Sequence, residues 1–336
     1  MTLPATRRVW RLHAYPQGND FAAAIKLEDE AIAPLAEGEV AFAPAMLSLD
    51  AGTRMWMTPR TDSYQPPIPL GSPVPGQGLG RVIASRADGF AQGDLVRAFG
   101  QWSDLSIVRP ELSGLVRLDE SVADPRQHMG VLGMNGWTAL VGIAEVGRMK
   151  AGETVLVSAA AGSTGLLAAQ IARILGARVI GIAGGPRKCA WLTDELGLDA
   201  AVDHRGDDVE GAIAAAAPNG VDVYFDNVGG PLLDSVLPNM AHYGRIALCG
   251  LVAGYAEAQP GPRRFDQILA RRLQITGFFS PDFVDRGTEL TARLRGWLDA
   301  GELVMPFDTT AGLDHVLDAY VKLFTGGNIG KVIVTL

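Results

Sequence analysis

Hydrophobic and polar positions change their period along this chain, and the clearest change lies between residues 153 and 184. An apolar, β-rich run, Thr154 to Val157, leads through a turn of small residues into a long helical pattern that ends at Gly176. A second apolar run, Arg178 to Ala183, follows directly. A strand, a glycine turn, a helix and a strand within about thirty residues predict one βαβ unit of a parallel sheet.

The same alternation continues downstream. Helices are predicted over 187–196, 209–217 and 231–240, and strands over 200–203, 221–227, 244–250 and 273–279. Together with the first two strands, this gives about six parallel strands and predicts an α/β fold with a Rossmann-type, doubly wound sheet. Helices at 289–300 and 313–325 and a closing strand at 331–336 come next.

The first part of the chain has a different pattern, with short β segments such as 39–43, 80–85 and 94–98 separated by turns. The proline-rich stretch 64–75 is expected to be an extended loop or edge. These features predict a mostly antiparallel, partly open barrel, followed by a connecting helix at 138–146.

The order of the segments predicts two domains. A substrate domain is expected over residues 1–124 with 301–336, and a dinucleotide-binding domain over 125–300. The cleft between them is the expected site.

Composition narrows the choice of function. The chain has 336 residues, of which 48% are hydrophobic and 20% charged, and its net charge of −8 without a basic cluster argues against a nucleic-acid partner. No apolar run is long enough to span a membrane, and the N-terminal stretch MTLPATRRVWRLH lacks the apolar core of a signal peptide. Two cysteines cannot form a disulfide framework or a four-thiolate zinc site. We therefore expect a cytoplasmic protein.

The turn after the first strand of the βαβ unit reads Ala160-x-Gly162-x-x-Gly165, a dinucleotide fingerprint with alanine in place of its first glycine. Gly162 is expected to let the backbone approach a pyrophosphate, and Gly165 to let the helix pack on the strand. Free N–H groups of the helix that begins near Ser163 are expected to face the phosphates. An ordinary strand–helix turn is the alternative.

The end of the second strand decides between NAD and NADP. An NAD site needs a carboxylate there for the ribose 2′-hydroxyl, but the chain has Ala183, Gly184 and Gly185. Arg187 and Lys188 follow, which favours the 2′-phosphate of NADPH. In the alternative, these two cations are solvated helix charges.

Several motifs occur together in one order: Leu47-Ser48-Leu49-Asp50, Leu132-Gly133-Met134, Ala159 to Gly165, Ala183 to Cys189, Tyr224 to Gly230, Cys249-Gly250-Leu251 and Asn328-Ile329-Gly330-Lys331. With these motifs the chain resembles the medium-chain dehydrogenase/reductase superfamily. Within it, the chain is similar to the zinc-free branch of prostaglandin and leukotriene reductases, curcumin reductases and plant double-bond reductases. The resemblance covers nearly the whole chain and implies that the β-rich domain is a GroES-like barrel.

Zinc ligands of the zinc-dependent relatives have no counterparts in this sequence. Leu47 to Asp50 contains no cysteine, and Gly76-Gln77-Gly78 stands where those enzymes have a histidine–glutamate pair. The resemblance therefore implies a zinc-independent enzyme without a metal site.

The implied reaction is hydride transfer from NADPH to the β-carbon of an α,β-unsaturated ketone or aldehyde. The developing enolate oxygen needs a hydrogen-bond donor in a dry cleft. By its motif, Tyr255 matches the family tyrosine near the nicotinamide, which either bonds the enolate oxygen or orients the nicotinamide ribose. The alternative is a loop aromatic packed at the domain interface.

The resemblance also implies a set of cofactor-binding residues. They are Gly162, Ser163, Thr164 and Gly165 for the pyrophosphate, Lys188 and His204 for the 2′-phosphate, and Asn227, Cys249, Gly250, Tyr255, Phe278, Phe279, Ser280 and Asn328 around the nicotinamide. For Cys249 the alternative is a small buried hydrophobe, and for Asn328 a turn residue.

Departures from the family pattern make the substrate uncertain. His204 stands where the family usually has a tyrosine, and it is either a phosphate ligand or a solvent-facing residue. Gly52 replaces a tyrosine, and Asn135 replaces the usual proline after Met134. We predict a wider or more polar substrate pocket that includes Arg54, Tyr64 and Asn135.

Two other functions remain open. A quinone reductase would use the same cofactor site, and a non-catalytic NADPH-binding protein would keep the fold for assembly or sensing. The resemblance further implies a homodimer, with the strand at 273–279 extending the sheet across a two-fold axis.

Overall fold

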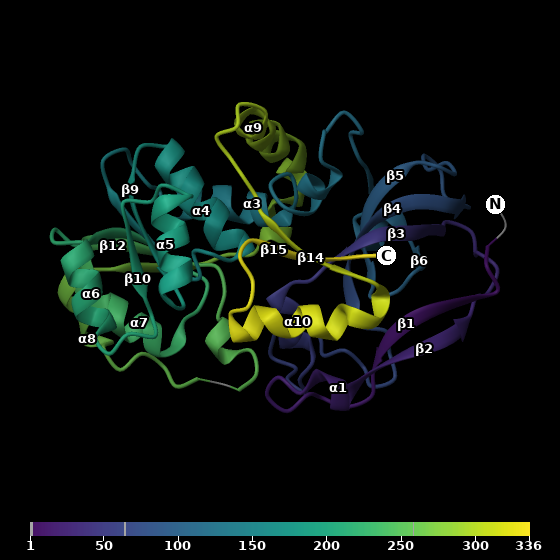
Figure 1. The fold of residues 1–336 in the computed structure, drawn as a ribbon, viewed down its shortest axis with the longest axis horizontal. Coiled ribbons are helices and arrows are strands. Elements are labelled where there is room, and N and C mark those ends of the chain that lie inside the picture. The colour runs from purple at the N-terminus through teal and green to yellow at the C-terminus, as the bar shows by residue number, and fades with distance from the viewer. Residues whose placement is uncertain (1–2, 64, 258) are drawn as a thin grey trace. The chain divides into compact units, whose positions relative to one another are not determined.

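The computed structural model describes residues 3–63, 65–257 and 259–336. Contacts within the chain divide it into two compact units, Met1–His128 with Phe307–Leu336, and Met129–Pro306. Each unit is described by itself below, with its elements labelled in Figure 1. The assignment of one unit to the substrate and the other to the cofactor stays a prediction.

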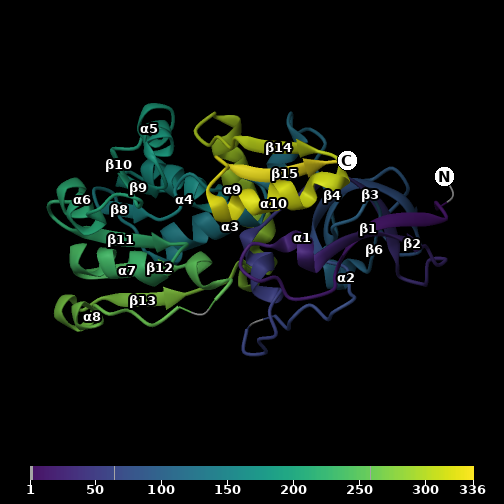
Figure 2. The same ribbon diagram turned by 60° about the horizontal axis from the view of Figure 1, so that its bottom comes forward.

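The second unit contains a parallel sheet of six strands among the described residues, in the order β10-β9-β8-β11-β12-β13. Figure 2 shows these strands side by side in that order. They are β8 (Thr154–Val157), β9 (Arg178–Ala183), β10 (Ala200–Asp203), β11 (Val221–Asp226), β12 (Met240–Leu248) and β13 (Gln274–Gly277). The strand order reverses between β8 and β11, so their carboxyl ends form the edge at which doubly wound folds bind ligands. The predicted Rossmann-type sheet is confirmed.

Helices precede, separate and follow these strands along the chain. They are α3 (Met134–Val141), α4 (Ser163–Ile174), α5 (Pro186–Asp194), α6 (Val209–Ala216), α7 (Gly230–Val236), α8 (Asp266–Arg271) and α9 (Gly287–Asp299). Buried side chains of α6 and α7, including Ile213 and Val236, share one hydrophobic core with Leu156, Ile180 and Ile246 of the sheet. This burial of apolar side chains holds the helices on the sheet.

The connecting helix ends at Val146 as predicted but differs from the prediction in its start and in the form of its second half. It begins at Met134 rather than Thr138, and residues Gly142–Val146 continue it as a π-helix. A Cβ at Gly142 would lie 2.3 Å from the ring of Phe225 and 2.6 Å from that of Phe278. Only glycine fits at this position, because the two aromatic rings approach the helix backbone so closely.

The first unit contains a mostly antiparallel sheet of order β14-β15-β3-β4-β5-β7, with β6 paired to β3. Its strands are β3 (Val40–Ser48), β4 (Pro75–Ser85), β5 (Leu95–Gln101), β6 (Ser106–Val108), β7 (Val116–Arg117), β14 (Phe307–Ala311) and β15 (Lys331–Thr335). Strands β1 (Thr6–Leu12) and β2 (Ile25–Ala31) form a separate antiparallel pair. The helices are α1 (Phe21–Ala24), α2 (Pro110–Ser113) and α10 (Val316–Thr325).

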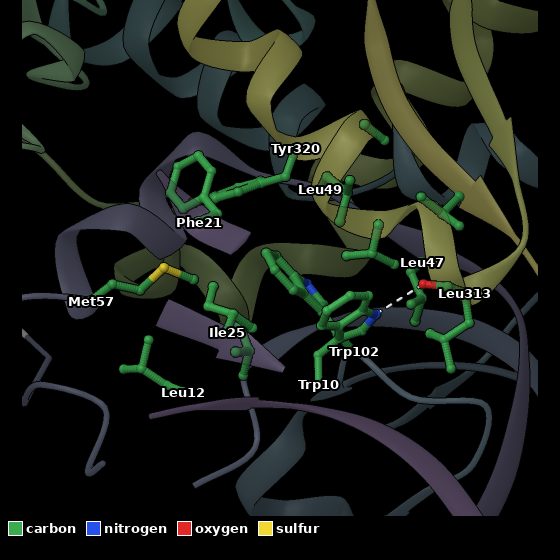
Figure 3. Packing of buried hydrophobic residues seen from close by; sticks show 14 of the residues in the cluster. Trp10, Leu12, Phe21, Ile25, Leu47, Leu49, Met57, Trp102, Leu313 and Tyr320 are labelled. Atoms are coloured by element: carbon green, nitrogen blue, oxygen red, sulfur yellow. Dashed lines mark hydrogen bonds between the residues drawn. The ribbon is translucent and has the colours of Figure 1, made fainter. Parts of the chain in front are cut away.

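Aromatic side chains join the two chain segments of this unit, as Figure 3 shows. Trp102 is completely buried, and its ring lies 4.9 Å from that of Tyr320 on α10 in a T-shaped arrangement. Phe21 packs against the same tyrosine at 4.8 Å. The indole N–H of Trp10 donates to the carbonyl of Leu313 at 2.9 Å. Residues from both ends of the sequence therefore share one core, in which each aromatic pair contributes about 1 kcal/mol beyond its area.

Candidate cofactor and active site

The turn between β8 and α4 has the tight geometry that its glycines predict. Gly162 is the N-cap of α4, which begins at Ser163 as expected. A Cβ at Gly165 would lie only 2.4 Å from the carbonyl oxygen of Ala159, so this position requires glycine. The left-handed residue of the turn is Ala159, with φ of 48°, and not Ala160 of the fingerprint. The N–H groups at the start of α4 are available in principle for a phosphate.

Asn135 contacts this turn. Its side-chain amide donates to the hydroxyl of Thr164 at 2.9 Å, which ties the start of α3 to the start of α4. The sequence prediction placed Asn135 in the substrate pocket, and a contact with substrate stays a prediction.

Lys188 lies in the first turn of α5 and is 9% exposed. Neither a hydrogen bond nor an ion pair joins its ammonium group to any residue that the structure describes. Burial lowers its pKa, and the positive charges of Arg187 and Arg205 lower it further. A buried cation without a partner is costly, and an anion beside it would remove that cost.

Two further side chains lie against the backbone that precedes α5. A Cβ at Gly184 would lie 2.8 Å from Nε2 of His204 and 3.0 Å from Nε of Arg205. The carboxylate of Asp203 fixes this arrangement by accepting the N–H of Gly185 at 2.8 Å and that of Arg205 at 2.9 Å. These two backbone hydrogen bonds lower the pKa of Asp203.

Arg205 was not predicted from the sequence, although it directly follows His204 after β10. The sequence feature that could have identified Arg205 is the pair Gly184-Gly185. Because these residues have no side chains, a long side chain can lie directly against their backbone. Arg187, Lys188 and Arg205 surround the N-terminus of a nine-residue helix, whose cap is Gly185. The charges and the helix end together fit a phosphate dianion, and β9 ends in Ala183 rather than in a carboxylate.

The carboxyl ends of β8, β11 and β12 bring together the residues predicted for the nicotinamide. Asn227 is 9% exposed; its backbone N–H donates to the hydroxyl of Ser158 at 2.8 Å, and its side-chain amide to the Ser158 carbonyl at 2.7 Å. Burial and the neighbouring Asp226 carboxyl raise the pKa of the Cys249 thiol to about 12. The thiol is therefore protonated at neutral pH and is not a nucleophile.

Tyr255 follows a single 3₁₀ turn, Val252–Gly254, and is partly buried. Its hydroxyl accepts the N–H of Leu251 at 3.3 Å. A Cβ at Gly250 would lie 3.0 Å from the same hydroxyl, so the phenol rests on the backbone of the Cys249–Gly250 turn. A phenol hydroxyl is both an acceptor and a donor, and as a donor it can stabilise an oxyanion.

The other residues predicted to bind the cofactor differ in how deeply they are buried. Phe278 is buried against Phe225, with ring centroids 6.3 Å apart, whereas Phe279 is 40% exposed and Ser280 is partly buried. Asn328 is 6% exposed, and its side-chain amide donates to the carbonyl of Gly330 at 3.0 Å. Contact of these residues with the carboxamide end of the cofactor stays a prediction.

Arg54 is 1% exposed inside the first unit. Its guanidinium donates to the carbonyl of Met57 at 2.9 Å, of Pro16 at 3.0 Å and of Gly18 at 3.3 Å. Burial lowers its pKa. These bonds hold the loop at residues 16–18 against the 3₁₀ helix that contains Arg54.

Tyr64, predicted for the substrate pocket, lies outside the described residues. Within the described ranges, no cluster of three or more His, Cys, Asp or Glu side chains could hold a metal ion. Nor does any helix there have the length and apolar character needed to cross a membrane.

Comparisons with known proteins agree on one family. Residues 8–116 match the family described as N-terminal domain of oxidoreductase, and residues 163–294 match the one described as zinc-binding dehydrogenase. An NADPH-dependent curcumin reductase of Escherichia coli is 35% identical over 97% of this chain and 96% of its own length. A 2-alkenal reductase (NADP⁺-dependent) of Nicotiana tabacum is also 35% identical, over 95% of this chain and 93% of its own.

A solved structure is similar over the same extent. CurA from Vibrio vulnificus in complex with NADPH covers 98% of both chains with a TM-score of 0.91 and 34% identity. From this match, the two family matches and the curated relatives, it follows that the chain belongs to the medium-chain dehydrogenase/reductase superfamily, in its zinc-free branch of curcumin and alkenal reductases.

Proposed function

We propose that this protein reduces the C=C bond of α,β-unsaturated ketones and aldehydes, with NADPH as the hydride donor. The observation that supports the cofactor is Lys188 at the N-terminus of α5, a residue that is 9% exposed and whose ammonium group no ion pair or hydrogen bond joins to the described residues. The substrate class is supported by the names of the curcumin and 2-alkenal reductases, to which the chain is 35% identical over nearly its whole length.

The cofactor-binding roles follow from the chemistry of each group. The turn at Gly162 to Gly165 binds the pyrophosphate through the free N–H groups that begin at Ser163, because a helix N-terminus carries positive partial charge. Lys188, His204 and Arg205 bind the 2′-phosphate. The remaining groups, Asn227 and the Cys249–Gly250 turn, line the nicotinamide end.

Bound NADPH supplies the hydride that adds to the β-carbon of the substrate. Tyr255 donates a hydrogen bond to the carbonyl oxygen, which becomes negatively charged as the enolate forms. The α-carbon of the enolate then takes a proton from solvent water, which completes the saturated carbonyl product. The thiol of Cys249 is not a nucleophile in this chemistry, because its raised pKa keeps it protonated.

The substrate pocket of this proposal includes Asn135, Tyr64 and Arg54. Arg54 acts through the backbone that it holds at residues 16–18 and at Met57.

A small substrate panel tests the function. NADPH consumption is measured with a conjugated enone, an enal, a quinone, and a simple alcohol with NADP⁺, and the products are analysed for reduction of C=C or C=O. We expect the saturated ketone from the enone and no oxidation of the alcohol. Turnover confined to the quinone would replace the proposal by quinone reduction, and NADPH binding without any turnover would contradict an enzymatic role.

A homodimer is the second part of the proposal. Membership of the superfamily supports it, and β13 pairs only with β12 among the described strands, with all four of its residues exposed. Light scattering tests it: Ile275→Lys, at a position that is 40% exposed, should give monomers. Leu112→Lys, at an exposed position of the other unit, is the matched control and should leave the mass unchanged.

A further inference from the structure

Asp226 is a completely buried carboxyl group at the end of β11, and one of its two oxygens receives an unusual number of hydrogen bonds. Its Oδ1 accepts four donors: the backbone N–H of Val228 at 2.9 Å, that of Gly229 at 2.9 Å, the hydroxyl of Tyr224 at 2.9 Å and the hydroxyl of Ser158 at 3.1 Å. This one oxygen therefore fixes the turn after β11 and ties it to the end of β8.

The backbone of Asp226 also forms hydrogen bonds just beyond the end of a third strand, β12. Its carbonyl oxygen accepts the N–H of Cys249 at 2.8 Å and that of Gly250 at 3.0 Å, just beyond the end of β12. Asp226 consequently connects the carboxyl ends of β8, β11 and β12. All the residues proposed above for the nicotinamide end, apart from the segment 278–280 and Asn328, belong to these turns or follow them directly.

The turns that Asp226 connects are closely packed against one another. A Cβ at Gly250 would lie 3.0 Å from the hydroxyl of Tyr255 and 3.1 Å from the carbonyl oxygen of Asn227. At Gly229, where φ is 65°, a Cβ would lie 2.5 Å from the side chain of Leu251. A displacement of the Asp226 turn therefore moves the backbone on which Tyr255 rests.

The second carboxyl oxygen of Asp226 has a different environment. Oδ2 is buried and has no hydrogen-bond partner among the described residues. An amide in place of the carboxyl would keep the acceptor at Oδ1 and would break no hydrogen bond at Oδ2. Asparagine is therefore the substitution that preserves the arrangement, whereas serine removes the oxygen that accepts four donors.

We propose that Asp226 is a positioning residue of the reductase, which fixes the turns bearing Asn227, Cys249, Gly250 and Tyr255 at the nicotinamide end. The proposal rests on the proposed function. It assigns to Asp226 no contact with substrate or cofactor.

The test separates the two ends of the cofactor. Steady-state kcat with an enone is measured together with the Kd of 2′,5′-ADP, which carries the 2′-phosphate and the adenosine but lacks the nicotinamide. For Asp226→Ser we expect a loss in kcat of about a hundredfold, because small misplacements of reacting groups have effects of this size. The Kd of 2′,5′-ADP should stay within about twofold of wild type, because the carboxyl ends of β9 and β10 and the start of α5 are unchanged.

Two milder variants keep the test decisive if Asp226→Ser does not fold. Asp226→Asn should retain kcat within about threefold, and Tyr224→Phe, which removes one of the four donors, should lower kcat by about two- to tenfold. Tyr243→Phe, at a tyrosine that is 67% exposed in the same unit, is the matched control and should leave kcat unchanged.

Several results would overturn the proposal. The proposal is wrong if the Asp226→Ser and Tyr224→Phe variants both have the kcat of the wild-type protein. The proposal is also wrong if Asp226→Ser lowers kcat and the affinity for 2′,5′-ADP by the same factor, because equal losses would indicate a general structural role for Asp226. If the wild-type protein does not bind 2′,5′-ADP at all, the proposed function fails and the positioning role fails with it.

Discussion

The two proposed ends of the cofactor site are built from different interactions. At the adenosine end, three cationic side chains, Arg187, Lys188 and Arg205, gather at the start of α5, and recognition depends on charge. At the nicotinamide end, backbone turns are fixed by a buried carboxyl group and by close contacts at glycine. If the two proposals hold, this fold discriminates between cofactors with side chains and positions the reacting groups with its backbone. Substitutions should therefore affect affinity at one end and rate at the other.

The strongest test of this contrast is Lys188→Ala. It removes the charge that we propose to bind the 2′-phosphate, and we expect the KM for NADPH to rise by about a hundredfold, which corresponds to the loss of a charge-assisted hydrogen bond. The KM for NADH should change little. Initial rates with both cofactors check the prediction, and equal losses for both would contradict the assignment of Lys188.

Tyr255→Phe tests the opposite end. We expect kcat to fall by between about tenfold and a hundredfold, because the enolate loses a donor in the transition state. The KM for NADPH should stay close to that of wild type. A primary isotope effect with deuterated NADPH should increase as hydride transfer becomes slower, and an unchanged kcat with chemistry limiting would assign the donor role to another group.

Arg205→Ala sharpens the comparison at the adenosine end. Because Arg205 is exposed and lies on the Gly184–Gly185 backbone, we expect a rise of only about tenfold in the KM for NADPH, with kcat unchanged. Arg263→Ala, at another exposed arginine of the same unit, is the control and should have no effect. A selective effect on NADH would rule out the phosphate contact.

The smallest expected effect concerns stability and pH at Asp226. Burial raises the pKa of this carboxyl above its ordinary value of 3.8. Below pH 3.8 the group is protonated in both the folded and the unfolded state. As the pH rises toward the folded-state pKa, only the unfolded state ionises, so the wild type loses stability, by about 1.4 kcal/mol for each unit that separates the two pKa values.

Asp226→Asn lacks this titration. Denaturant unfolding of both proteins between pH 3.5 and neutral pH should show a difference in unfolding free energy that grows with pH in favour of the variant. A difference that is constant over this range would indicate that the folded-state pKa of Asp226 is not raised.

The parallel sheet could be predicted in detail from the sequence because its strands are buried and bounded by turns. The predicted bounds of β8, β9 and β10 coincide with the observed ones, and the order of helices and strands from β8 to β12 is confirmed. The hairpin of β1 and β2 was not resolved in the prediction, because its partly exposed positions leave a weak alternation. The short helix α8 was also missed, since it has no buried residue to set a helical period.

The site was predictable only as far as local patterns determine it. The turn at Gly162 and Gly165 and the cation at Lys188 lie within one short stretch, so motifs identify them. The role of Asp226 depends on Ser158, which is 68 positions earlier in the sequence, and that of Arg205 depends on glycines at the end of another strand. Such contacts exist only after the strands have been placed side by side.

The first unit is built from both ends of the chain, so its two segments are synthesised at different times. The hydrogen bond from the Trp10 indole to the Leu313 carbonyl joins positions 303 residues apart, and β15 lies between β14 and β3. At about 5 to 20 residues per second, a ribosome needs roughly 15 to 60 s to make the chain between these two positions. The second unit is continuous in sequence and can fold during that interval, while the apolar side chains of the first unit wait for α10 and β15. A chaperone that binds exposed hydrophobic segments on the ribosome would therefore have its longest opportunity at the residues around Trp10 and Phe21.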